Sequence, residues 1–153
     1  FSVIFAINSG GLITFSLLGS RVVGRRGSAW LLRRGLVGTA TASMAALVVT
    51  VAHASLGALL VCFFALLCAN GIVLPNGTAS AMAAGGGALG SASALLGLGQ
   101  FGSGALVAPL VGLAGSRDAL PMAIVIAAAG TAALLVDLLF APREAPVPSR
   151  AES

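Results

Sequence analysis

Three side-chain amides are the residues of this chain best suited to binding an uncharged ligand. Asn8, Asn70 and Gln100 each stand near the middle of a long stretch without formal charge. An amide both donates and accepts hydrogen bonds, and deep in an apolar medium it needs a partner or water. Two uses are open: the amides line a polar cavity, or they hold helices together. Phe101, beside Gln100, either offers an aromatic face to an apolar ligand or fills a core.

Patterns typical of soluble enzymes fail in this chain. Gly97, Gly99 and Gly102 form a GxGxxG pattern, but small helix-forming residues precede it, where a dinucleotide site needs a β-strand. Cys62 and Cys68 are spaced neither as a redox pair nor as zinc ligands. We expect no enzymatic activity, no cofactor and no metal site.

The composition indicates a membrane protein. Of 153 residues, 58% are hydrophobic, only 8 are Lys or Arg and 4 are Asp or Glu, and the mean hydropathy is +1.08. A membrane-spanning helix needs about 20 apolar residues, and no formally charged residue occurs between Arg34 and Arg117. The expected fold is an all-α integral membrane bundle within residues 1–141. Its five transmembrane helices are expected at about 1–20, 33–52, 56–82, 89–115 and 120–141.

The arginines predict the orientation of these spans. Most of them fall in one short predicted loop between the first two spans: Arg21, Arg25, Arg26, Arg33 and Arg34. Such clustering is typical of a cytoplasmic loop, and it explains the net charge of +4 without nucleic acid. Four further crossings place the tail, 142–153, in the cytoplasm, where its Pro, Ser, Arg and Glu residues predict disorder. The chain begins with an apolar helix at Phe1, so we expect it to be a piece of a longer protein.

Small residues recur every four positions in the fourth span, a spacing that lets membrane helices approach closely. We expect helix packing at Gly90, Gly104 and Gly112. This stripe leaves a second reading open, in which the chain is a small structural membrane subunit that packs through its glycines and transports nothing.

Asp137 is the only acidic residue inside a predicted span. An intramembrane carboxylate often belongs to a proton relay. Asp137, however, lies about one turn from the cytoplasmic end of its span, where its side chain can reach the interface at small cost. The interfacial role is the favoured one.

Several segments together resemble the C-terminal half of the Bcr/CflA-type drug-efflux transporters of the major facilitator superfamily. They are FSVIFAIN at 1–8, NGIVLPN at 70–76, GSASALLG at 90–97, QFG at 100–102 and ALPMA at 119–123. The resemblance implies that the five spans are helices eight to twelve of a twelve-helix bacterial plasma-membrane antiporter. Such a protein exports small hydrophobic antibiotics in exchange for protons, and its N-terminal half would be missing here. In that fold the eighth, tenth and eleventh helices, which correspond to the spans that carry the three amides, line the central cavity.

A loop motif of the same superfamily is similar to the arginine-rich segment that follows the first span. The matching residues are Gly19, Arg21, Gly24, Arg25 and Arg26. The segment departs from the motif because Ser20 replaces its acidic residue and one residue is added before Gly24. The gating ion pair of the motif is therefore not carried over, and we expect these arginines to fix topology and to contact membrane lipid.

Overall fold

The computed structural model describes residues 2–85, 88–113 and 119–140, and every element in this part of the chain is a helix. The helices are α1 (Ser2–Arg26), α2 (Ser28–Val51), α3 (Leu56–Ala84), α4 (Leu89–Leu113) and α5 (Leu120–Phe140). All five are long and apolar enough to cross a membrane. The all-helical, five-span architecture expected from the sequence is confirmed. The predicted tail, 142–153, lies outside the described residues.

The arginine-rich segment differs from the loop expected at 21–32. Helix α1 continues to Arg26, α2 starts at Ser28, and only Gly27 separates them. Arginine is a good helix former, so charge marks where a helix leaves the hydrocarbon rather than where it ends. The break falls at Gly27, whose φ of 80° lies in the left-handed region that glycine adopts readily.

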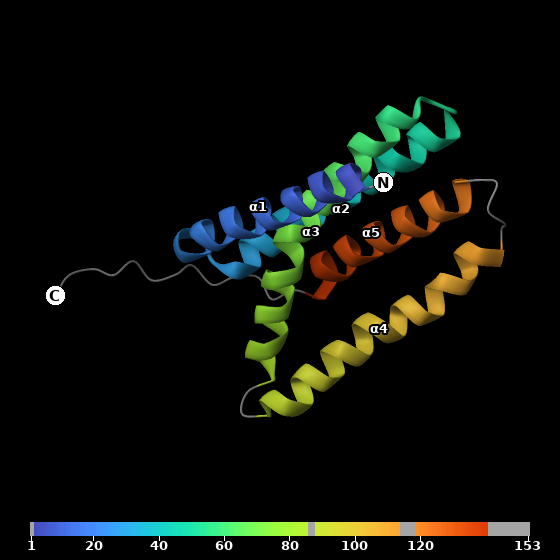
Figure 1. Cartoon of the computed structure of the whole chain (residues 1–153). Coiled ribbons are helices and arrows are strands. Elements are labelled where there is room, and N and C mark those ends of the chain that lie inside the picture. The colour runs from blue at the N-terminus through green and yellow to red at the C-terminus, as the bar shows by residue number, and fades with distance from the viewer. Residues whose placement is uncertain (1, 86–87, 114–118, 141–153) are drawn as a thin grey trace.

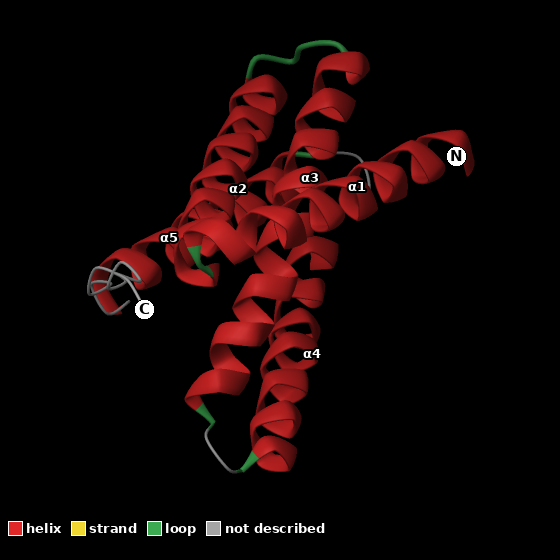
Figure 2. Cartoon of the chain, turned by 90° about the vertical axis from the view of Figure 1, so that its left-hand side faces the viewer, coloured by secondary structure: helices red, strands yellow, loops and turns green. Residues whose placement is uncertain are grey.

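Helix α3 is the centre of the bundle. Helices α1 and α2 both pack on α3, and α5 packs on the far side of α2. Figure 1 shows α4 lying to one side of this group: it starts near the end of α3 and runs away from it in roughly the direction of α5. In Figure 2 α4 points away from the crossing of the other helices. No described residue of α4 is buried.

Glycines set the closest helix contacts. A Cβ atom at Gly71 of α3 would collide with the backbone carbonyl of Leu12 in α1. A Cβ atom at Gly35 of α2 would lie 2.8 Å from Val73 of α3, and one at Gly130 of α5 would lie 2.7 Å from Ser43 Oγ of α2. Small residues at these crossings let the helix backbones approach, which is how membrane helices gain packing energy.

Helix α3 runs unbroken through Pro75. Its second half turns away from the line of its first half (Figure 1), as expected where a proline removes a hydrogen bond from a helix interior. The bend carries residues near Ala84 away from α1 and α2 and toward α4. Near this end a Cβ atom at Gly85 would lie 2.6 Å from Ala92 Cβ of α4.

Candidate ligand-facing grooves

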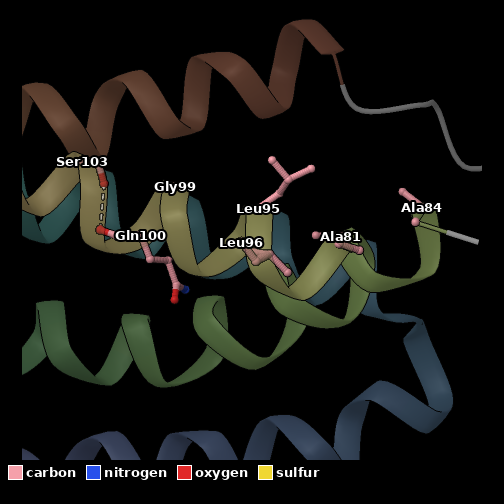
Figure 3. Close-up of a pocket in the computed structure, with 9 residues that line it drawn as sticks. Ala81, Ala84, Leu95, Leu96, Gly99, Gln100 and Ser103 are labelled. Carbon is pink, nitrogen blue, oxygen red and sulfur yellow. Dashed lines mark hydrogen bonds between the residues drawn. The ribbon is translucent and has the colours of Figure 1, made fainter. Parts of the chain in front are cut away.

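Gln100 borders an open groove of about 610 Å³ between α3 and α4. The end of α3 contributes Ala81 and Ala84 to the walls, and α4 contributes Leu95 and Leu96. Figure 3 shows the Gln100 side chain extending from α4 on the side where α3 runs. The other lining side chains near it are small or apolar apart from Ser103, whose hydroxyl donates to the Gln100 carbonyl oxygen at 3.0 Å.

The Gln100 amide is free to bind a ligand. The side chain is exposed, and within the described part of the chain it has no hydrogen-bond partner. An unpaired amide among apolar walls can orient a ligand that is mostly apolar. Phe101 has an exposed fraction of 81% and does not line this groove. Neighbouring helix residues point about 100° apart, which places the Phe101 ring outside the groove that Gln100 borders. A role for Phe101 as a ligand contact stays a prediction.

Asn8 lies in a different, smaller groove. It is half-buried and borders a space of about 240 Å³ between α1 and the first half of α3, beside Leu60, Val61 and Phe64. This groove is apolar apart from the Asn8 amide.

Asn70 turns its amide back onto its own helix. Its Nδ2 donates to the Leu66 carbonyl oxygen at 3.0 Å, which leaves the Oδ1 atom as its remaining acceptor. Val61 and Phe64, which border the Asn8 groove, precede Asn70 by about two helical turns, or ~11 Å along the axis. The structure therefore does not bring Asn8, Asn70 and Gln100 together in one groove of the described residues.

The arginine-rich end contains two kinds of arginine. Arg33 is held by Asp137: its Nε donates to Asp137 Oδ2 at 3.0 Å, and the exposed side-chain fractions are 47% and 11%. Arg26 and Arg34 instead stack on the only tryptophan, with their Cζ atoms 4.7 and 5.1 Å from the centre of the Trp30 ring. Trp and Arg side chains are both common at the membrane interface.

The remaining residues of the expected loop motif are helical. Gly19 is buried in α1, where a Cβ atom would lie 3.4 Å from Leu31 Cδ2 of α2. A Cβ atom at Gly24 would meet nothing within 4 Å, and Arg21 and Arg25 are exposed. Gly19 is thus the member of this set that packs between helices.

Two glycines of the α4 stripe, Gly90 and Gly104, face open space within the described part of the chain. A Cβ atom at Gly90 or Gly104 would meet nothing within 4 Å, and the side-chain surroundings at Gly112 lie outside the described residues. Close packing within the chain involves Gly35, Gly71 and Gly130 instead. A packing role for the α4 stripe stays a prediction.

Sequence reasoning missed two polar features. Asn76 is buried, and its Nδ2 donates to the Ile72 carbonyl oxygen at 2.7 Å, one turn earlier in α3. The second is the ion pair of Arg33 and Asp137. The signal for this pair was present, because both residues lie near the same predicted side of the membrane and carry opposite charges.

The chain is similar in sequence to part of a curated bacterial transporter. The chain is 34% identical over 122 residues to the uncharacterized MFS-type transporter YdgK of Bacillus subtilis (strain 168). The match covers 80% of this chain and 30% of the relative, so the chain spans about a third of the relative's length. No protein-family profile matches the chain, and no solved structure matches it. The chain is therefore similar to part of an MFS-type transporter, and its described residues form five helices of membrane-spanning length.

Proposed function

We propose that this chain is part of a secondary active transporter of the bacterial plasma membrane that exports small hydrophobic drug-like molecules in exchange for protons. The observation that carries the proposal is the 34% identity over 122 residues to an MFS-type transporter. The chain spans 30% of that relative, so transport would belong to the complete protein that contains it. Similarity to a transporter also supports a non-enzymatic role.

The groove between α3 and α4 supports a mostly apolar, uncharged substrate. Gln100 supplies two N–H donors and one carbonyl acceptor, and the walls around it are mainly alanine and leucine. In alternating access, the two halves of a transporter rock about a site between them. The exposed face of α4, where no described residue is buried, would then meet the other half of the protein.

Asp137 is not the proton carrier in this proposal. Its carboxylate accepts a hydrogen bond from Arg33 Nε at 3.0 Å near the arginine-rich end of the bundle, so it joins α2 to α5. The coupling acid would lie in the part of the complete protein outside this chain. This assignment agrees with the interfacial role favoured from the sequence.

The orientation proposed from the arginines places the arginine-rich end and the C-terminus in the cytoplasm. Membrane lipid, the transported molecule, protons and the other half of the protein are then the expected partners.

The test is drug accumulation in bacteria that lack their own efflux pumps and express the complete protein. We expect lower accumulation of some hydrophobic drugs than in cells with an empty vector, and an uncoupler should abolish the difference because it removes the proton gradient. Unchanged accumulation across a broad panel, with the protein present in the membrane, would favour the structural-subunit alternative.

A further inference from the structure

A third groove, which shares only Phe64 with the Asn8 groove, runs along the bundle from its arginine-rich end. It is lined by α2 and α3, with Phe15 as its single lining residue from α1, around a space of about 630 Å³. Its lining is largely small or apolar, including Phe15, Gly35, Gly38, Ala45, Phe64 and Cys68. Thr41 also lines it, but its hydroxyl donates to the carbonyl oxygens of Val37 and Gly38 in its own helix. Most of the groove is therefore suited to hydrocarbon.

One end of this groove is positively charged. Arg34 lines the groove, and its guanidinium also lies 5.1 Å from the Trp30 ring centre, while that of Arg26 lies 4.7 Å from the same centre. Within the described residues neither arginine has a carboxylate partner, whereas Arg33 is paired with Asp137. Arg34 thus places a guanidinium without a carboxylate partner at the end of the groove, and Arg26 adds a second positive charge beside the same indole ring. Arginine binds phosphate oxygens well.

We propose that this groove holds an anionic phospholipid, with its phosphate against Arg34 at the charged end and one acyl chain along α2. Three helical turns separate Arg34 from Ala45, a distance of ~16 Å along the axis. One leaflet of the hydrocarbon core is ~15 Å thick, half of the usual ~30 Å. The charged end and the apolar length thus match the two parts of a lipid, whereas free phosphate would use the charged end alone. This inference does not depend on transport activity.

The experiment uses Trp30 fluorescence in the complete protein, with any other tryptophan replaced by phenylalanine. The protein is reconstituted in vesicles that contain either dibrominated phosphatidylglycerol or dibrominated phosphatidylcholine at equal mole fraction, because bromine quenches indole fluorescence at short range. We expect phosphatidylglycerol to occupy the site several-fold more than phosphatidylcholine. Equal quenching by the two lipids would overturn the proposal and would also be the result if another part of the protein fills the groove.

Two pairs of variants distinguish lipid binding in the groove from diffuse electrostatic attraction of anionic lipid to the protein. Arg34→Gln should lower the preference for phosphatidylglycerol several-fold, whereas Arg21→Gln removes the same charge from an exposed position that does not line the groove and should leave it nearly unchanged. Ala45→Phe fills the groove and should lower lipid occupancy, whereas Ala133→Phe adds the same ring to an exposed position on α5 and should not.

Each alternative outcome contradicts the proposal in a different way. Equal losses in Arg34→Gln and Arg21→Gln would show diffuse attraction of anionic lipid. Normal occupancy in Ala45→Phe would show that no acyl chain lies in the groove. A change in Trp30 fluorescence with millimolar inorganic phosphate, without any preferential quenching by brominated phosphatidylglycerol, would show that the charged end binds phosphate itself rather than a lipid.

Discussion

Arg33 and Asp137 join α2 to α5 through a hydrogen bond of 3.0 Å from Nε to Oδ2. The pair is unequal, because the exposed side-chain fraction is 47% for Arg33 and 11% for Asp137. An arginine left without its partner can extend toward lipid headgroups. A largely buried carboxylate left without its partner remains an uncompensated charge away from water, which is unfavourable.

Because the two side chains differ in exposure, removing Arg33 and removing Asp137 should lower the free energy of unfolding by different amounts. Arg33→Gln should destabilise the complete protein by ~1–3 kcal/mol, because it leaves a charge without a partner. Asp137→Asn should cost less than ~1 kcal/mol, as for a partly exposed ion pair. Thermal unfolding in detergent measures both, and adding Asp137→Asn to Arg33→Gln should recover part of the loss. Equal losses, or a double variant that loses the sum of both, would contradict the pairing.

The close contact of Gly71 with Leu12 predicts that replacing Gly71 with a larger residue destabilises the protein. Its Cβ would meet backbone atoms, which cannot rotate away, so Gly71→Ala should cost ~1–3 kcal/mol through overpacking. Gly104→Ala makes the same change where nothing lies within 4 Å. Comparable melting temperatures for the two variants would show that α1 and α3 do not cross here. A strong loss in Gly104→Ala would instead indicate that α4 packs on another part of the complete protein.

Ser43 and Gly130 offer a test by suppression. A Cβ atom at Gly130 would lie 2.7 Å from Ser43 Oγ but 3.4 Å from Ser43 Cβ. Gly130→Ala should therefore lower the melting temperature, and Ser43→Ala should restore much of it by removing the hydroxyl. The Ser43 hydroxyl donates only to the Ala40 carbonyl oxygen of its own helix, so its loss alone should cost little. Failure of the second change to rescue the first would show that the α2–α5 spacing is different.

Most of the fold could be predicted from the sequence, because long uncharged stretches must span the membrane as helices. The details of the arginine-rich end could not. Charge shows where the hydrocarbon ends, but α1 continues as helix to Arg26, and the break depends on one backbone angle at Gly27. The pair of Arg33 and Asp137 depends on which helices are neighbours, which periodicity within single spans does not reveal.

The candidate site was less predictable than the fold. Position along a span placed Asn8, Asn70 and Gln100 at similar depth, but it does not say which way a side chain points. In the structure Asn70 bonds to Leu66 within α3, while Asn8 and Gln100 border separate grooves. Glycine spacing likewise predicted a stripe on α4, but the contacts form where another helix is present, at Gly35, Gly71 and Gly130.

The placement of Gln100 predicts a selective change in drug resistance. With abundance in the membrane held equal, Gln100→Leu should lower resistance to drugs that use the amide and preserve resistance to others, because each drug would bind it differently. Gln100→Asn keeps the amide and should have a smaller effect. Phe101→Leu should also have a smaller effect, since that ring does not line the groove. An unchanged profile in Gln100→Leu would remove Gln100 from the site, and a uniform loss for all drugs would indicate a contact between helices instead.

The orientation predicts which ends of the helices are accessible from outside. In a cysteine-free complete protein, a single cysteine at Ala29, which is exposed near the arginine-rich end, should be shielded from an impermeant maleimide in intact cells. A cysteine at Ala54, exposed in the turn between α2 and α3, should be labelled. The reverse pattern would invert the proposed topology.

The most direct test of the account is transport by the purified complete protein in proteoliposomes. A pH gradient is imposed across the vesicle membrane, and the movement of a fluorescent hydrophobic drug is followed with Gln100→Leu measured in parallel. The drug should move opposite to the proton gradient, and an ionophore that dissipates the gradient should abolish that movement. Gln100→Leu should reduce the movement of at least one drug. Absence of gradient-driven movement for every drug, from protein shown to be folded, would contradict the proposal that this chain belongs to a proton-coupled exporter.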